Sequence, residues 1–117
     1  MNRPDVERLR DARAYAQHAQ FHAGGLDADI LAGAWQPQHA ALYALAVVGE
    51  TLKRVSPSIR QASPDLPWRL VVDVRNIILH AYWQIDFEII ADVIEHRLDP
   101  LIAQLDNLID LVENAQQ

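Results

Sequence analysis

Four polar side chains interrupt an apolar stretch in the second half of the chain. The segment DVRNIILHAYWQID, residues 73–86, carries Arg75, Asn76, His80 and Tyr82 among Val, Ile and Leu. Imidazole can accept a proton near neutral pH, and a guanidinium can hold the non-bridging oxygens of a phosphate. Cleavage of RNA without a metal needs a group that takes the 2′-hydroxyl proton and a cation that stabilises the phosphorane. These residue types therefore suggest phosphodiester chemistry.

The spacing of these residues limits how one helix can use them. Arg75 and Tyr82 are seven residues apart and fall nearly in register, whereas Arg75 and His80 lie about 140° apart around the axis of an ideal helix. The helix could end or distort near His80, the long Arg75 side chain could reach around, or a second copy could complete the site across a two-fold axis. The structural alternative pairs Arg75 with an acid such as Glu50 and leaves His80 and Tyr82 at the surface.

The charge of the chain is unevenly distributed. The 117 residues have a net charge of −6, yet residues 51–80 carry five Lys or Arg against Asp65 and Asp73, and residues 81–117 carry Arg97 against eight acidic residues. Because phosphate binding depends on local cation density, an acidic total does not exclude an RNA-binding cleft. Three residues of this basic segment, Lys53, Arg54 and Arg69, are candidates for contacts with the RNA backbone.

Composition and periodicity predict an all-α fold, a small antiparallel helical bundle of about five helices in a single domain spanning residues 1–117. We expect long helices over Val6–Phe21, over Gln38–Val55, from Pro67 onward, from an Asp86 cap to Arg97, and from an Asp99-Pro100 start onward. Short helical turns are expected after Asp27 and in the connector SPSIRQASPDLPW. In the last helix, an apolar stripe is formed by Leu101, Leu105, Leu108, Ile109 and Val112.

The sequence has no cysteine, no run of about 18 apolar residues and no apolar segment behind its charged first residues. We therefore expect a cytoplasmic protein without a membrane span. His18 and His22 have a spacing that can hold zinc, but neither a cysteine nor an obvious third ligand accompanies them, so we expect no metal. No glycine-rich phosphate-binding pattern occurs, and we expect no cofactor.

Three segments of the sequence, VVGETLKRVSP, PDLPW and RNIILHAYWQIDFEII, resemble in wording and order the HepT family of HEPN-domain ribonuclease toxins. The similarity covers roughly Ala44 to Leu105. The signature of the family, R-x4-H-x-Y, is matched by Arg75, His80 and Tyr82, with the polar Asn76 after the arginine. The sequence departs from the family at Ala81, where Gly is more usual, and at Ala91, where Trp is expected.

This resemblance implies a helical homodimer in which the two motifs meet to form a metal-independent endoribonuclease site, with Arg75 and His80 catalytic and Asn76 and Glu50 supporting. It also implies a toxin–antitoxin pair whose antitoxin, a minimal nucleotidyltransferase, neutralises the toxin by transferring AMP to Tyr82. An anionic AMP group beside a cationic cleft would exclude an RNA phosphate by charge and volume. Glu50 remains open to two interpretations, a carboxylate that orients Arg75 or a surface residue that follows a helix-packing Gly49.

Two other functions are compatible with the same residues. The chain could be a non-catalytic nucleotide- or RNA-binding partner of the nucleotidyltransferase, in which the motif holds phosphate without cleaving it. It could also be a structural helical dimer whose polar residues stabilise the interface. Turnover of RNA separates the first alternative from the enzyme, and the effect of Arg75 and His80 substitutions on stability separates the second.

Overall fold

The structure is a computed structural model, and it describes residues 4–115. Its α-helices are α1 (Asp5–Ala23), α2 (Ala28–Gly33), α3 (Trp35–Lys53), α4 (Pro57–Ala62), α5 (Trp68–His80), α6 (Phe87–Asp92) and α7 (Leu98–Ala115). A 3-10 helix, η1 (Tyr82–Gln84), follows α5, and a π-helical segment, η2 (Val93–Arg97), joins α6 to α7. The described residues contain no strand, so the prediction of an all-α fold is confirmed. The single-domain prediction covers residues 1–117, and its first three and last two residues lie outside the described part.

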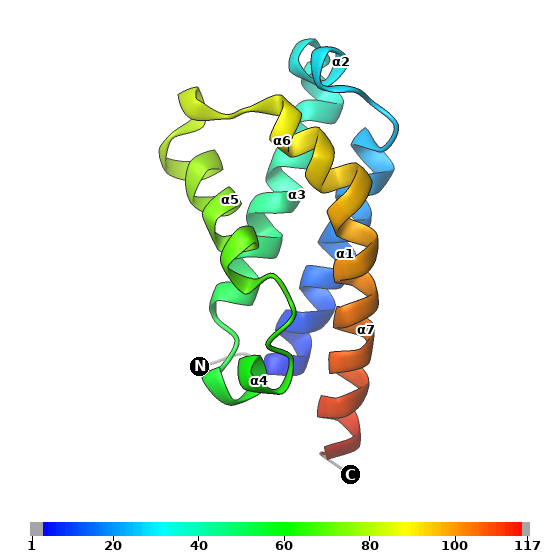
Figure 1. The fold of residues 1–117 in the computed structure, drawn as a ribbon, viewed down its shortest axis with the longest axis vertical. Coiled ribbons are helices and arrows are strands. Elements are labelled where there is room, and N and C mark those ends of the chain that lie inside the picture. Colours follow the sequence, from blue (N-terminus) through cyan, green and yellow to red (C-terminus); the bar gives the residue numbers. More distant parts are fainter. Residues whose placement is uncertain (1–3, 116–117) are drawn as a thin grey trace.

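The long helices run antiparallel, and α5 lies on the outer side of the bundle (Figure 1). Helix α1 packs against both α3 and α7, whereas α5 packs mainly against α3. The buried side of α1 consists of Leu9 and the small residues Ala12, Ala16, Ala19 and Ala23. Small side chains let neighbouring helices approach closely, and the core between them is filled by the large leucines of α7, including Leu101, Leu105 and Leu108.

Two predicted aspartate caps are present in the structure. The Asp27 side chain accepts a hydrogen bond from the Ile30 N–H at 2.9 Å and begins α2, and Asp86 accepts one from the Glu88 N–H at 2.9 Å and begins α6. Each bond satisfies an amide that has no partner inside its own helix. The predicted apolar stripe of the last helix is buried from Leu101 to Val112.

The prediction that Asp99 and Pro100 begin a separate fifth helix is wrong. The chain is helical without interruption from Phe87 to Ala115, and Figure 1 shows α6 and α7 as one continuous segment. The Leu98 N–H donates to the Val93 carbonyl five residues earlier, as a π-helical turn requires. Pro100 has no N–H to donate and therefore leaves one hydrogen bond of the helix unmade. It lies in the turn that follows the π-helical segment, so both irregularities occur close together in one helix. Asp99 accepts a hydrogen bond from the Gln20 side chain at 2.7 Å instead of capping.

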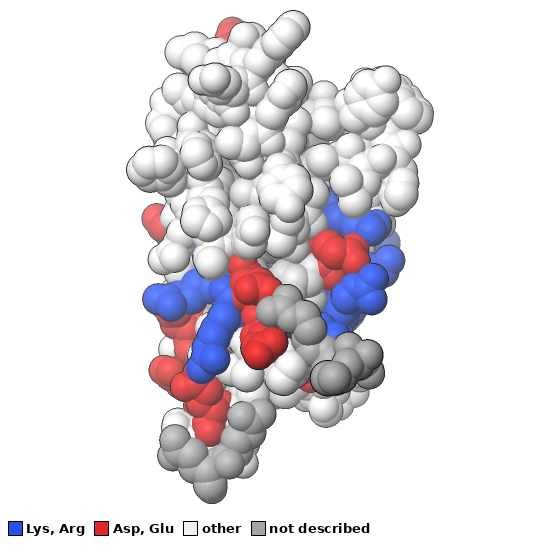
Figure 2. Space-filling view, turned by 180° about the vertical axis from the view of Figure 1, so that it is seen from behind, with Lys and Arg blue, Asp and Glu red and all other residues white. Residues whose placement is uncertain are grey.

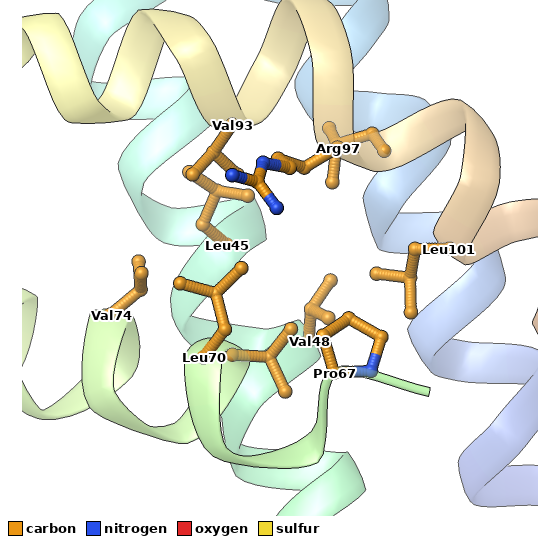
Figure 3. A pocket seen from close by; sticks show the side chains of 10 residues that line it. Leu45, Val48, Pro67, Leu70, Val74, Val93, Arg97 and Leu101 are labelled. Atoms are coloured by element: carbon orange, nitrogen blue, oxygen red, sulfur yellow. The ribbon is translucent and has the colours of Figure 1, made fainter. Parts of the chain in front are cut away.

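A small apolar pocket of about 20 Å³ lies between α5 and the η2–α7 segment. It is lined by Leu70 and Val74 of α5 and by Val93 and Leu101 on the opposite side, and the Arg97 side chain extends across it (Figure 3). None of the four polar residues of the 73–86 segment lines this pocket. No helix within residues 4–115 is both long and apolar enough to cross a membrane.

The close approach of α3 and α5 gives a first testable prediction. A Cβ atom added to Gly49 would lie 2.4 Å from the Arg75 Cβ and 2.4 Å from the Val71 carbonyl oxygen, so the two helices would have to move apart. We expect Gly49→Ala to lower the free energy of unfolding, measured by urea denaturation, by about 1–3 kcal/mol. Gly33→Ala is the matched control, because no atom lies within 4 Å of its added Cβ. Equal stability of the Gly49 variant and the parent protein would contradict the steric argument.

Candidate active site

Arg75 lies directly over Gly49, and this contact determines which residues surround the guanidinium. Since Gly49 has no side chain, the Arg75 Cβ can sit against the α3 backbone. The next residue of α3 is Glu50, and its Oε2 lies 2.8 Å from Arg75 Nη2. The Arg75 side chain is only 15% exposed. Both interpretations of this part of the sequence therefore describe real features: Gly49 permits close helix packing, and Glu50 contacts Arg75.

Glu50 is shared by two guanidinium groups. Arg54 Nε donates to Glu50 Oε1 at 2.8 Å, while Arg75 contacts the other carboxylate oxygen. Arg75 Nη1 also donates to the Asn76 side-chain oxygen at 2.8 Å, so that neighbour helps to fix its orientation. Two cations and one carboxylate leave the Glu50–Arg54–Arg75 cluster with a net positive charge. The Arg54 side chain of this cluster is 66% exposed, so its guanidinium can also contact an anion from solvent.

The contact between Arg75 and Glu50 is an ion pair with imperfect hydrogen-bond geometry. Within the described residues, neither Glu50 Oε2 nor Arg75 Nε has a hydrogen-bond partner, although both atoms are buried. The 2.8 Å separation of Oε2 from Nη2 nevertheless places opposite charges in direct contact. Buried polar atoms that lack hydrogen bonds cost stability, and they are often found at functional sites.

The pKa of the Glu50 carboxyl lies below its ordinary value. The hydrogen bond from Arg54 is the largest cause, burial acts in the opposite direction, and the positive charge of Arg75 contributes further lowering. The carboxyl is therefore ionised throughout the neutral range and keeps both arginines in place there.

His80 and Tyr82 lie at the exposed end of α5. The helix ends at His80, where the Ala81 N–H donates to the Ile77 carbonyl, and the chain then turns into η1. His80 is exposed, and no hydrogen bond or ion pair links its imidazole to any described residue. The Tyr82 side chain is 71% exposed and meets the Trp83 ring edge-on at 5.6 Å. Ala81 has a φ of −145°, so this turn does not require the glycine that is more usual in the family.

The structure therefore brings together only some of the predicted site residues. Arg75, Asn76, Glu50 and Arg54 form one connected cluster, whereas no hydrogen bond or ion pair joins the His80 imidazole to it. The helix does end at His80, which was one of the three geometric solutions, but no hydrogen bond joins His80 to Arg75 within the described residues. The position of Arg54 in the cluster could have been predicted, because Glu50 and Arg54 have the i, i+4 spacing of a helical ion pair.

The other candidates for RNA contact have more open surroundings. Lys53 is exposed at the end of α3. The Arg69 side chain is 95% exposed, and its Nε lies 3.8 Å from Asp73. No group of three or more His, Cys, Asp or Glu side chains within residues 4–115 is arranged to hold a metal ion, and this includes His18 and His22.

The lowered pKa of Glu50 gives a second prediction. Because the folded protein favours the ionised carboxylate, Glu50 contributes stability above the ordinary glutamate pKa and loses it as the pH falls through the lower folded value. We expect Glu50→Gln to lower the free energy of unfolding at pH 7 by about 1–2 kcal/mol, and the difference from the parent protein to close in acid.

Urea unfolding at a series of pH values measures this difference. Asp110→Asn is the control, since Asp110 is exposed and no ion pair joins it to any described residue. A deficit of the Glu50 variant that stays constant down to the acid range would show that ionisation of this carboxyl does not stabilise the fold.

Comparison with known proteins relates this geometry to a family. A family model described as "Ribonuclease HepT-like" matches residues 7–108. The chain is 29% identical to "Putative RNase MJ1380" of Methanocaldococcus jannaschii over 58 residues, which are 50% of this chain and 53% of that protein. It is 25% identical to "Probable ribonuclease HepT" of Thermococcus cleftensis over 71 residues, 61% of this chain and 64% of that protein.

The matched stretch thus spans less than two thirds of the length of each of these relatives. No solved structure matches the chain significantly. The family model, in contrast, covers most of the chain and includes all of the residues from Gly49 to Trp83 that build the cluster and the end of α5. The chain belongs to the HepT-like ribonuclease family.

Proposed function

We propose that this chain is a metal-independent endoribonuclease. Membership of the HepT-like ribonuclease family supports an RNA-cleaving activity. The observation that carries the proposal is the Glu50–Arg54–Arg75 cluster, which keeps an excess positive charge beside a helix that ends in an exposed imidazole. A cation for the phosphate and a proton acceptor for the 2′-hydroxyl are the two groups that the reaction needs.

Arg75 is the phosphate-binding group in this proposal. Its side chain is held between Gly49, Glu50 and Asn76, so little conformational freedom remains to be lost when RNA binds. Arg54 is 66% exposed and lies on the same carboxylate, where it can contact a neighbouring phosphate. Lys53 and Arg69 add positive charge at the ends of α3 and α5 and guide the RNA backbone.

His80 acts as the proton-transfer group. The imidazole accepts the 2′-hydroxyl proton, O2′ forms a bond to phosphorus, and the bond from phosphorus to O5′ breaks. The leaving O5′ oxygen then takes a proton from an imidazolium. No hydrogen bond joins His80 to Arg75 within one chain's described residues, and we place the reaction at a two-fold contact where Arg75 of one copy faces His80 of the other.

Tyr82 is the control point of the enzyme in this proposal. Tyr82 is 71% exposed and lies two residues beyond His80, so its hydroxyl is accessible to a partner. A nucleotidyltransferase partner transfers AMP from ATP to this oxygen and releases pyrophosphate. The added phosphodiester competes with RNA for the arginines and fills the space beside His80. The pair then functions as a toxin and its antitoxin.

The third prediction concerns cleavage of RNA by purified protein. We expect His80→Ala to lower the cleavage rate by about 100- to 10,000-fold, because it removes the proton acceptor. Arg75→Ala is expected to lower the rate by about 100- to 1,000-fold, because it removes the phosphate-binding cation. His96→Ala is the matched control, since this exposed histidine lies on η2 outside the motif. Circular dichroism and thermal unfolding check that each variant remains folded.

Mixing the two inactive variants tests whether the site is shared. A mixed dimer of the Arg75→Ala and His80→Ala chains contains one intact pair of Arg75 and His80, so mixing restores activity if the groups come from different chains. If mixing restores nothing although the chains exchange, both groups act from the same chain. If the parent protein binds RNA and never cleaves it, the chain is instead a non-catalytic RNA-binding partner of the nucleotidyltransferase.

The fourth prediction concerns modification of Tyr82. When the chain is incubated with its nucleotidyltransferase partner and ATP, intact-mass spectrometry should find the mass of AMP added to the parent protein and not to the Tyr82→Phe variant. The modified protein should lose RNA cleavage. Tyr15→Phe and Tyr43→Phe are controls that remove the other phenols. Addition of AMP to the Tyr82→Phe variant at the parent level would place the modification elsewhere.

A further inference from the structure

The short helix that follows α5 carries two aromatic side chains next to the proposed catalytic histidine. Tyr82 and Trp83 belong to η1, and η1 packs against the end of α5. Trp83 is 70% exposed, and its ring meets the Tyr82 ring at an interplanar angle of 80°. A neighbour that packs edge-on covers at most one face of an indole, so a face of the Trp83 ring remains open to a ligand.

The other two tryptophans have partners elsewhere in the fold. The half-buried Trp68 donates from its indole N–H to the Ser63 carbonyl at 2.9 Å, and Trp35 stacks on the His39 imidazole at 6.3 Å. In contrast, the indole N–H of Trp83 has no hydrogen-bond partner among the described residues, and the one ring that it contacts there is its neighbour in η1. The Trp83 side chain therefore adds little to the packing of the fold.

The backbone of η1 holds Trp83 in a defined position. The Gln84 N–H donates to the Ala81 carbonyl at 2.7 Å and closes the turn. On the other side of η1, Ile85 packs against the core and Asp86 caps α6. Both ends of η1 are thus anchored, so the backbone that carries the indole has little freedom to lose when a ligand binds.

The charge pattern around this ring matches that of a surface for unpaired nucleic acid. Residues 76–85 contain no Lys, Arg, Asp or Glu, whereas residues 51–75 contain five Lys or Arg and two Asp. In Figure 2, the lobe at the upper right, which belongs to the end of α5 and to η1, shows no charged side chain, and Lys and Arg side chains gather directly below it. A cationic surface that continues into exposed aromatic rings is typical of proteins that bind single-stranded nucleic acid.

We propose that the Trp83 indole stacks on an unpaired base of the RNA substrate, at a nucleotide close to the phosphate that is cleaved. Trp83 follows His80 by three residues, which span at most about 11 Å of chain. Inside a duplex both faces of a base are covered by its neighbours, so the indole can stack only on a base outside a duplex. The substrate class is therefore single-stranded RNA or the loops of a folded RNA.

This inference rests on the proposed function, since it takes His80 as the group next to the scissile phosphate. Every base has a π-face, so an indole distinguishes unpaired from paired nucleotides and is tolerant of sequence. Trp83 is in these terms a residue that determines the specificity of the enzyme, and it takes no part in proton transfer.

Titration with oligoadenylate tests the contact without requiring cleavage. In the His80→Ala background, oligoadenylate should quench tryptophan fluorescence, and the same strand annealed to oligouridylate should not. Trp83→Phe should abolish the quenching and keep most of the affinity, because a phenyl ring also stacks, whereas Trp83→Ala should raise the dissociation constant by about 5- to 150-fold. Trp35 provides the matched controls, since it is 72% exposed outside the motif: Trp35→Phe should keep the quenching, and Trp35→Ala should keep the affinity.

Cleavage kinetics test whether the stacked base belongs to the substrate in the reaction. A stack that is equally strong in the ground state and the transition state acts on KM alone. With His80 intact, Trp83→Ala should therefore raise KM for unpaired RNA by a factor similar to the rise in the dissociation constant, with kcat nearly unchanged, and Trp83→Phe should restore KM. Damage to the fold would instead lower kcat and the melting temperature together.

The outcomes separate this inference from the proposed enzyme. Quenching that persists in the Trp83→Phe variant, equal quenching by the duplex, or an unchanged dissociation constant in the Trp83→Ala variant overturns the stacking contact, even if the parent protein cleaves RNA. A Trp83→Ala protein whose RNA affinity is unchanged and whose mass in sedimentation has fallen would place the indole in a contact between protein chains, which also overturns the inference. Quenching that depends on Trp83 in a parent protein that cleaves no RNA would support the contact and overturn the nuclease.

Discussion

The close contact between α3 and α5 at Gly49 is the constraint on which the rest of the site depends. Since glycine alone leaves room for the Arg75 Cβ and the Val71 carbonyl, α5 can lie against α3 with its arginine above the next residue, Glu50. The half-buried ion pair that results is costly to desolvate, and it is tolerated because Arg54 and Asn76 share in satisfying the charges. The absence of a side chain at Gly49 and the shared Glu50 carboxylate thus hold the mostly buried Arg75 guanidinium between α3 and α5.

Much of the fold could be predicted from local signals in the sequence. Asp27 and Asp86 begin helices because their side chains satisfy free amides, and the stripe from Leu101 to Val112 is buried because its spacing follows one side of a helix. The start predicted at Asp99 and Pro100 failed for a physical reason. The proline removes one hydrogen bond, but a π turn immediately before it lets the helix continue, and no residue type announces such a turn.

The candidate site was predictable in its residues and less so in its contacts. The types and spacing of Arg75, Asn76, His80 and Tyr82 pointed to one segment, and the ion pair of Arg75 with Glu50 was one of the two interpretations of Glu50. That pair depends on how α3 and α5 lie against each other, which the sequence indicates only through Gly49. The role of Arg54 as the second partner of Glu50 follows from helical spacing, yet its distance from Arg75 is a property of the folded chain.

The contacts that fix Arg75 do not include His80, and the proposed two-fold site takes account of this. The guanidinium of Arg75 is mostly buried and is held by Glu50 and Asn76, and no hydrogen bond or ion pair joins the His80 imidazole at the end of α5 to a described residue. A phosphate-binding group that is already ordered loses little conformational freedom when its ligand binds. In the proposed enzyme the arginine can stay fixed because the imidazole comes from another copy of the chain. Under the proposed function, activity depends on assembly as well as on the motif, and modification of Tyr82 acts two residues from the His80 imidazole.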